Sequence, residues 1–143
     1  MKKIVLSLLM ILTIVYADFT RSNGIVTDNK TGLQWQDDYS DNGGYIKSAK
    51  WTDAIVYCES LSLGGYDDWR LPNIIELRSI VDRSLVNPAI DPTFLSVTSY
   101  FYWSSTAHTY YAGGVWVVDF SDGNSNDYSK SHTYYVRCVR GGQ

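Results

Sequence analysis

The stretch Asp68-Trp69-Arg70-Leu71-Pro72-Asn73-Ile74-Ile75-Glu76-Leu77 predicts how the middle of this 143-residue chain folds. Pro72 ends an extended segment, because proline disfavours helix in the residue before it. Asn73 stands three residues before Glu76, the spacing of a capping box with Asn in place of Ser or Thr. Apolar residues then recur at helical spacing, namely Ile74, Leu77, Ile80 and Val81. We therefore expect an extended segment that leads directly into a helix.

An earlier segment also has helical periodicity. Its apolar residues recur at three- and four-residue steps, namely Trp51, Ala54, Ile55, Cys58 and Leu61. Thr52 or Ser48 could cap the start of this helix, and Gly64-Gly65 is expected to stop it. Cys58 lies on the apolar stripe, where a disulfide partner can reach it.

The rest of the chain has β character. Strands are expected at residues 24–28, 32–35, 102–106, 115–120 and 134–139. The polar segment 121–133 begins with Asp122-Gly123 and is expected to be a hairpin loop. The order of strands, two helices and strands predicts an α+β domain, with two helices packed on a mainly antiparallel twisted sheet.

The N-terminus predicts export. Met1-Lys2-Lys3 is a short positive start, Ile4 to Val15 is largely apolar, and Val15-Tyr16-Ala17 suits a signal peptidase. We expect residues 1–17 to be a signal peptide and residues 18–143 to form a single domain. The apolar run of about 12 residues is shorter than the roughly 20 that a spanning helix needs. No membrane span is therefore expected after cleavage, and the expected destination is the periplasm, the cell surface or the medium.

Composition narrows the possible partners. Removal of residues 1–17 takes away Lys2 and Lys3 but no carboxylate, so the formal net charge changes from −3 to −5. No basic run follows, which argues against nucleic acid, and the negative charge argues against simple electrostatic capture of sulfated glycans. Aromatic residues make up 15% of the chain, with 12 Tyr and 5 Trp. Such side chains suit half-buried surfaces and binding faces.

Two cysteines, Cys58 and Cys138, are present, and both follow the expected signal peptide. In an exported domain they admit one intramolecular pairing, which predicts a disulfide. A zinc site would need closely spaced cysteine pairs, and the two histidines, His108 and His132, stand at no recognisable ligand spacing. We therefore expect no cofactor from these residues.

Two polar segments are candidate ligand-binding surfaces. The candidate residues are Tyr110 and Tyr111 in segment 107–114, and Asn124, Asn126 and Tyr128 in segment 121–133. Aromatic rings on Ser-, Gly- and Asn-containing loops are typical of adaptable binding surfaces. Tyr134 and Tyr135, beside the second segment, could add to the same face. The alternative is that several of these tyrosines only cover the sheet.

The same segment offers hard oxygen ligands of the kind that calcium prefers, at Asp122, Asn124, Asn126 and Asp127. The EF-hand pattern fails here, because glycine stands at 123 and no glutamate follows at the required distance. Polar turn residues account for the segment without a metal, so calcium remains an option only.

Catalysis is not expected. Asp67 and Asp68 are adjacent on an extended segment and point to opposite faces, which is unsuitable for flanking one glycosidic bond. The residue types of a hydrolytic triad are also present, namely Ser104, Ser105, His108 and Asp119. No Gly-x-Ser-x-Gly elbow exposes a serine, however.

Five sequence blocks, taken together, resemble a known family. They are Gly32-Leu-Gln-Trp35; Trp51-x-x-Ala54-x-x-Tyr57-Cys58; Asp68-Trp-Arg-Leu-Pro-Asn73 with Glu76-Leu77; Tyr102-Trp-Ser-Ser-Thr106; and Tyr135-Val-Arg-Cys-Val-Arg-Gly141. In this order they resemble the Lcl C-terminal domain family, named for the Legionella collagen-like adhesin, over roughly residues 24–142. That family is similar to the C-type-lectin-like fold and to the fold of sulfatase-modifying factors.

The resemblance implies a disulfide from a helix to the last strand, here Cys58 to Cys138. The sulfatase-modifying enzymes use a redox-active cysteine pair, and a disulfide here would leave no such thiol. Trp69, Arg70, Leu71, Pro72 and Trp103 are then structural: the Trp packs, the Arg pairs with a carboxylate and the Pro starts a helix.

The resulting hypothesis is an exported, non-catalytic binding or adhesion module, and the resemblance makes a polysaccharide or glycoprotein the leading ligand. One alternative is a subunit of an envelope protein assembly. A hydrolase or an enzyme like the sulfatase-modifying factors is the other.

Overall fold

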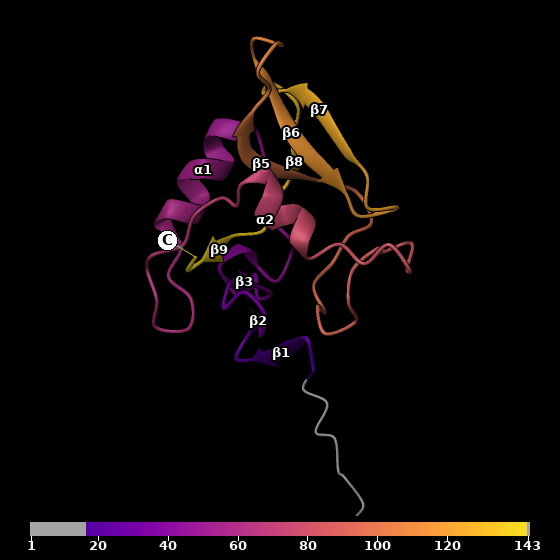
Figure 1. The fold of residues 1–143 in the computed structure, drawn as a ribbon. Coiled ribbons are helices and arrows are strands. Elements are labelled where there is room, and N and C mark those ends of the chain that lie inside the picture. Colours follow the sequence, from indigo (N-terminus) through magenta and orange to yellow (C-terminus); the bar gives the residue numbers. More distant parts are fainter. Residues whose placement is uncertain (1–16, 143) are drawn as a thin grey trace, which may run out of the picture.

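The computed structural model describes residues 17–142 (Figure 1). The expected signal peptide lies almost entirely in residues 1–16, outside the described residues. No helix in the described range is long and apolar enough to cross a membrane. The described chain is α+β, as predicted, with two helices, one short 3-10 helix and two sheets.

The smaller sheet lies below the larger one in Figure 1 and is antiparallel throughout, in the order β1-β2-β3-β9. Its strands are β1 (Phe19–Ser22), β2 (Ile25–Asp28), β3 (Gln34–Gln36) and β9 (Val139–Arg140). The expected hairpin of segments 24–28 and 32–35 is thereby confirmed. It gains an outer strand, β1, which the sequence pattern did not indicate.

The larger sheet has the order β4-β8-β5-β6-β7. Its strands are β4 (Ser48–Ala49), β5 (Phe101–Ala107), β6 (Gly114–Asp119), β7 (Ser125–Ser129) and β8 (Tyr134–Tyr135). All of its pairings are antiparallel except that of β5 with β8. This agrees with the mainly antiparallel pairing expected from the sequence.

The helices pack on the larger sheet. Helix α1 (Trp51–Ser60) contacts β4 and β5, and α2 (Ile74–Ser79) contacts β5 and β6. The 3-10 helix η1 (Ser40–Asn42) precedes β4. Successive residues of β5 point into different cores: Trp103 belongs to the cluster with Cys58 and Trp69, whereas Tyr102 belongs to the cluster with Leu77.

The capping prediction for α2 is confirmed. The Asn73 side chain accepts a hydrogen bond from the Glu76 N–H at 2.8 Å, and the Glu76 carboxylate accepts one from the Asn73 N–H at 3.0 Å. The capping prediction for α1 was wrong. Its N-cap is Lys50, without a side-chain hydrogen bond. Helix α1 follows β4 directly, so Ser48 is in a strand and Thr52 is already inside the helix.

Two predictions for the C-terminal third were also wrong. Segment 121–133 is not all loop, because residues 125–129 form β7, hydrogen-bonded along β6. Segment 134–139 is not one strand, because β8 belongs to the larger sheet and β9 to the smaller. The three residues between them, 136–138, cross from one sheet to the other.

Arg137, in this crossing, is fully buried. Its guanidinium group donates to the Asp37 carboxylate at 3.1 Å and to the backbone carbonyls of Gln36 and Ser96. The same group lies over the rings of Phe94 and Tyr102. The cation is thus surrounded by acceptors and aromatic faces, the conditions under which a buried charge is tolerated.

The neighbouring Cys138 forms the expected disulfide with Cys58 of α1, with a Cα–Cα distance of 5.4 Å. No free cysteine occurs in the described chain. The bond closes a loop across a sequence separation of 80 residues. Helix α1 is therefore tied covalently to the segment that joins the two sheets.

Arg137→Met should destabilise the fold strongly, because it removes the fully buried one of the two cations that pair with the Asp37 carboxylate. The other, Arg21 at 2.7 Å, is part-exposed and remains. We expect a loss of about 3 kcal/mol in the free energy of unfolding, measured by urea titration. The matched control is Arg140→Met, because Arg140 pairs with the largely exposed Asp68. This substitution should cost much less, since a solvent-exposed ion pair contributes little. Equal losses for the two variants would contradict the assigned role of Arg137.

The double substitution Cys58→Ser/Cys138→Ser removes the disulfide. In the chain-entropy description it should lower the free energy of unfolding by about 4.5 kcal/mol, because the unfolded chain regains the conformational freedom that closing a loop of 80 residues had removed. The readout is the urea midpoint of the double variant against the oxidised wild type. Reduction of the wild-type protein should reproduce most of this shift. A midpoint unchanged in both cases would exclude a stabilising role for the bond.

Candidate functional site

The tip of the β5–β6 hairpin carries two of the tyrosines that the sequence singled out. Tyr110 is 94% exposed and Tyr111 is 50% exposed. The Tyr111 ring lies against Gly114, where an added Cβ would come within 2.2 Å of ring carbon Cδ1. Tyr111 therefore folds back on its own hairpin, and Tyr110 is left as the outward ring.

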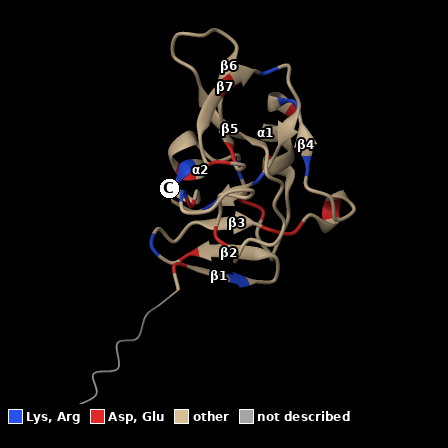
Figure 2. Ribbon diagram, turned by 90° about the vertical axis from the view of Figure 1, so that its right-hand side faces the viewer, with Lys and Arg blue, Asp and Glu red and all other residues tan. Residues whose placement is uncertain are grey.

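His108 holds this tip in shape. Its Nδ1 accepts hydrogen bonds from the backbone N–H groups of Tyr110 and Tyr111, at 3.3 and 3.0 Å. Its ring packs on Trp116 of β6 with a centroid separation of 5.1 Å. No residue from 108 to 113 is charged, and Figure 2 shows the tip above β6 without Lys, Arg, Asp or Glu. The tip therefore presents an uncharged aromatic surface on a short, braced loop.

The other candidate ligand residues do not gather here. The β5–β6 tip and the β6–β7 turn are at opposite ends of β6, because both hairpins share that strand. Asn124 is in the far turn, within 3.5 Å of Arg83. Asn126 and Tyr128 are in β7 rather than in a loop. The candidate set is therefore divided between two ends of the sheet, and its role in ligand binding stays a prediction.

Tyr128 belongs to a packed aromatic cluster. Its ring lies 5.0 Å from that of Phe101 and 5.4 Å from that of Tyr134, between ring centroids. His132 stacks on Tyr134, with an interplanar angle of 11°. Tyr134 is itself buried. For this group, the alternative that tyrosines cover the sheet fits the packing better than a free binding face does.

The calcium candidates have local partners. Asp122 accepts hydrogen bonds from the backbone and the side-chain amide of Asn124, at 2.9 and 2.8 Å. Asn126 and Asp127 are consecutive residues of β7, and their side chains point to opposite faces. Among residues 17–142, no group of three or more His, Cys, Asp or Glu side chains could hold a metal ion.

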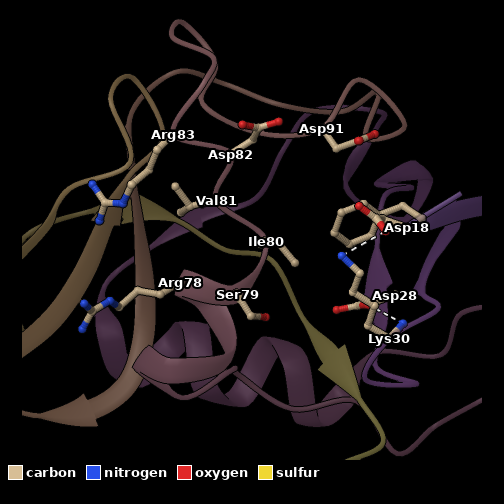
Figure 3. Close-up of a pocket in the computed structure, with 11 residues that line it drawn as sticks. Asp18, Asp28, Lys30, Arg78, Ser79, Ile80, Val81, Asp82, Arg83 and Asp91 are labelled. Carbon is tan, nitrogen blue, oxygen red and sulfur yellow. Dashed lines mark hydrogen bonds and ion pairs between the residues drawn. The ribbon is translucent and has the colours of Figure 1, made fainter.

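A hollow of about 400 Å³ lies between the first hairpin and the segment after α2, and sequence reasoning did not indicate it (Figure 3). Four carboxylates line it, at Asp18, Asp28, Asp82 and Asp91. Each has a near partner in the chain. Asp18 pairs with Lys30 Nζ. The other three accept from backbone N–H groups: Asp28 from Lys30, Asp82 from Ser84 and Asp91 from Thr93. Because these carboxylates stabilise local turns, the hollow is not assigned as a ligand site.

The Asp68–Leu77 stretch has structural partners throughout. Arg70 pairs with Glu76 through two hydrogen bonds of 2.7 Å. Trp69 and Leu71 are buried, as is Trp103 of β5, and Pro72 stands just before the N-cap of α2. The Trp thus packs, the Arg pairs with a carboxylate and the Pro precedes the helix; that these residues are purely structural stays a prediction.

Fold and surfaces together define a small α+β domain, closed by a disulfide, with an aromatic hairpin tip. Residues 24–140 match the family model of the Lcl C-terminal domain, and the chain belongs to that family. No curated protein matches the chain.

Glu76 should contribute pH-dependent stability. Burial alone would raise the pKa of Glu76, but hydrogen bonds from Arg70 and from the Asn73 N–H lower it, and the net pKa is below the usual value. The stabilisation is present above the ordinary glutamate pKa of about 4.3 and is lost as the pH falls through the lower folded-state pKa. The melting temperature of Glu76→Gln should therefore fall less between pH 7 and pH 3 than that of the wild type does. Glu59→Gln, on the exposed face of α1, should behave as the wild type does.

Proposed function

We propose that this chain is an exported, non-catalytic binding module that recognises a polysaccharide or glycoprotein through the tip of the β5–β6 hairpin. The observation that carries the proposal is the exposure of Tyr110, 94%, on a loop braced by His108. A large ring held in water without a covering partner loses apolar hydration when a sugar face or a side chain stacks on it. A braced loop also loses little conformational entropy on binding.

Export is supported by the positive and apolar N-terminal sequence and by the disulfide, because disulfides persist in oxidising compartments. Membership of the Lcl C-terminal domain family supports the same destination and the adhesion-type role.

The proposal of a non-catalytic module is supported by the engagement of several candidate catalytic side chains within the fold. Ser104 is buried and donates to the Trp116 carbonyl at 2.7 Å. His108 Nδ1 is occupied by two backbone N–H groups. Asp68 is paired with Arg140. A nucleophile or base already engaged in the scaffold is not available to a substrate.

The test is a glycan array probed with the oxidised protein, with calcium and again with EDTA. We expect binding to one class of glycan, at least tenfold weaker for Tyr110→Ala and retained by Tyr110→Phe, which keeps the ring. The control is Ile75→Ala, a similarly exposed apolar residue on α2, which should bind as the wild type does.

Binding should persist in EDTA. Loss of binding in EDTA would instead direct attention to Asp122, Asn124, Asn126 and Asp127 as metal ligands. A blank array from correctly oxidised protein would contradict the carbohydrate proposal. Co-purification of one specific envelope protein would then favour the assembly-subunit alternative.

A further inference from the structure

Besides the hollow of Figure 3, a second concave surface lies beside β4 and β8, toward the edge of the larger sheet opposite β7, and we call it the β4–β8 groove. It measures about 530 Å³ and lies between the segment that enters β4 and the loop that enters β5. One wall is formed by residues 44–46 and Ser48, the other by residues 95–98, and Tyr135 belongs to the groove as well. Tyr135 pairs with Ser48 in the sheet. This volume is typical of small-molecule sites.

Hydrogen bonds from the core hold the 95–98 wall in place. The backbone N–H groups of Leu95 and Ser96 both donate to the Asp37 carboxylate, at 3.0 Å. The Ser96 carbonyl accepts from Arg137, and the Thr98 N–H donates to the Tyr102 hydroxyl at 3.0 Å. These hydrogen bonds to Asp37, Arg137 and Tyr102 hold the 95–98 wall in one conformation without a ligand.

The opposite wall is also fixed through its backbone. The Gly44 N–H donates to the Tyr39 carbonyl at 2.8 Å, and the Asn42 side chain donates to the Tyr45 carbonyl at the same distance. The Tyr45 side chain, in contrast, is 79% exposed. A rigid backbone therefore presents a free aromatic ring at the edge of the groove.

The chemistry of the groove is neutral and rich in hydroxyl groups. No Asp, Glu, Lys or Arg lines it; Lys47, inside the same segment, lies over the Tyr57 ring instead, and Asp37 is buried behind the wall. Four lining residues carry hydroxyls that have no hydrogen-bond partner within the described chain, namely Tyr45, Ser48, Thr98 and Tyr135. Such a surface offers hydrogen bonds and stacking but no charge complementarity.

From this arrangement we infer that the β4–β8 groove binds an uncharged saccharide unit, with the Tyr45 ring stacked on a sugar face and the lining hydroxyls bonded to sugar hydroxyls. The inference rests on the proposed function and adds to it a second subsite and a ligand class, a neutral rather than a sulfated or acidic glycan. A neutral polyol matches the groove, because each of these four hydroxyls can both donate and accept. A charged sugar would lose its hydration there without gaining a counter-charge.

The test is a titration of isotope-labelled protein, expressed as the full chain and purified from an oxidising compartment, followed by amide NMR. The probes are uncharged hexasaccharides of the β-glucan, α-glucan, mannan and chitin types, with heparin and polygalacturonate hexasaccharides as anionic counterparts. At least one uncharged probe should shift the resonances of residues 44–48 and 95–98. Tyr45→Ala should raise its dissociation constant at that site at least tenfold, whereas Ile75→Ala, an exposed residue of α2, should change it less than twofold.

Tyr45→Ala leaves no internal void, because the side chain is mostly exposed, so its amide spectrum should match the wild type outside the groove. Thr98→Val, which keeps shape and removes one hydroxyl, should weaken binding severalfold as an independent variant.

Three results would overturn the inference. If a glycan shifts only residues 108–113 and Tyr45→Ala binds normally, the groove is not a subsite, while the proposed function stands. If only anionic probes shift the groove resonances, the ligand class is wrong. If no probe shifts either region, and the glycan array is also blank, the groove and the proposed function fail together.

Discussion

The buried ion pair between Arg137 and Asp37 is the interaction on which the relation between the two sheets depends. A guanidinium group taken out of water is costly unless its donors are engaged. Here Nη1 and Nη2 of Arg137 donate to one carboxylate and two backbone carbonyls, whereas Nε is buried without a hydrogen-bond partner in the described chain. Asp37 follows β3 of the smaller sheet directly, and Arg137 lies between a strand of each sheet. The pair therefore fixes where the chain leaves one sheet and enters the other.

Other features follow from that crossing. Cys138, the next residue, can bond to Cys58 only because the crossing passes beside α1. The carboxylate of Asp37 also accepts the backbone N–H groups of Leu95 and Ser96, so one buried anion shapes a surface loop as well as the core. The hydrogen bonds to this buried carboxylate therefore hold the 95–98 wall of the β4–β8 groove in place, although the strands of the domain are short.

The candidate binding surfaces share a lack of charge. The hairpin tip contains no charged residue, and none lines the β4–β8 groove. Where carboxylates do gather, in the hollow beside α2, they are engaged by nearby backbone N–H groups or a lysine (Figure 3). Charge near these surfaces thus serves mainly to hold turns and the core, and both candidate surfaces present rings, hydroxyls and amides instead.

Local chemistry explains which features the sequence could predict. The capping box at Asn73 and Glu76, the helical periodicity from Trp51 and the single possible cysteine pairing depend on a few neighbouring residues or on a count. Strand β7 escaped prediction because its residues, Ser-Asn-Asp-Tyr-Ser, have low intrinsic strand preference. It is extended because β6 offers it a continuous ladder of hydrogen bonds.

The features of the candidate surfaces likewise fall into those that the sequence predicts and those that only the tertiary structure sets. The sequence by itself determined the α+β class, the disulfide and the aromatic character of segment 107–114, because these follow from residue type, count and periodicity. Tertiary structure alone decided that 134–139 divides between two sheets, that Asn124 is far from Tyr110, and that Tyr45, Thr98 and Tyr135 share a groove. The physical reason is that these residues are brought together or separated by long-range pairing, above all by the buried contact of Arg137 with a carboxylate 100 positions earlier in the chain.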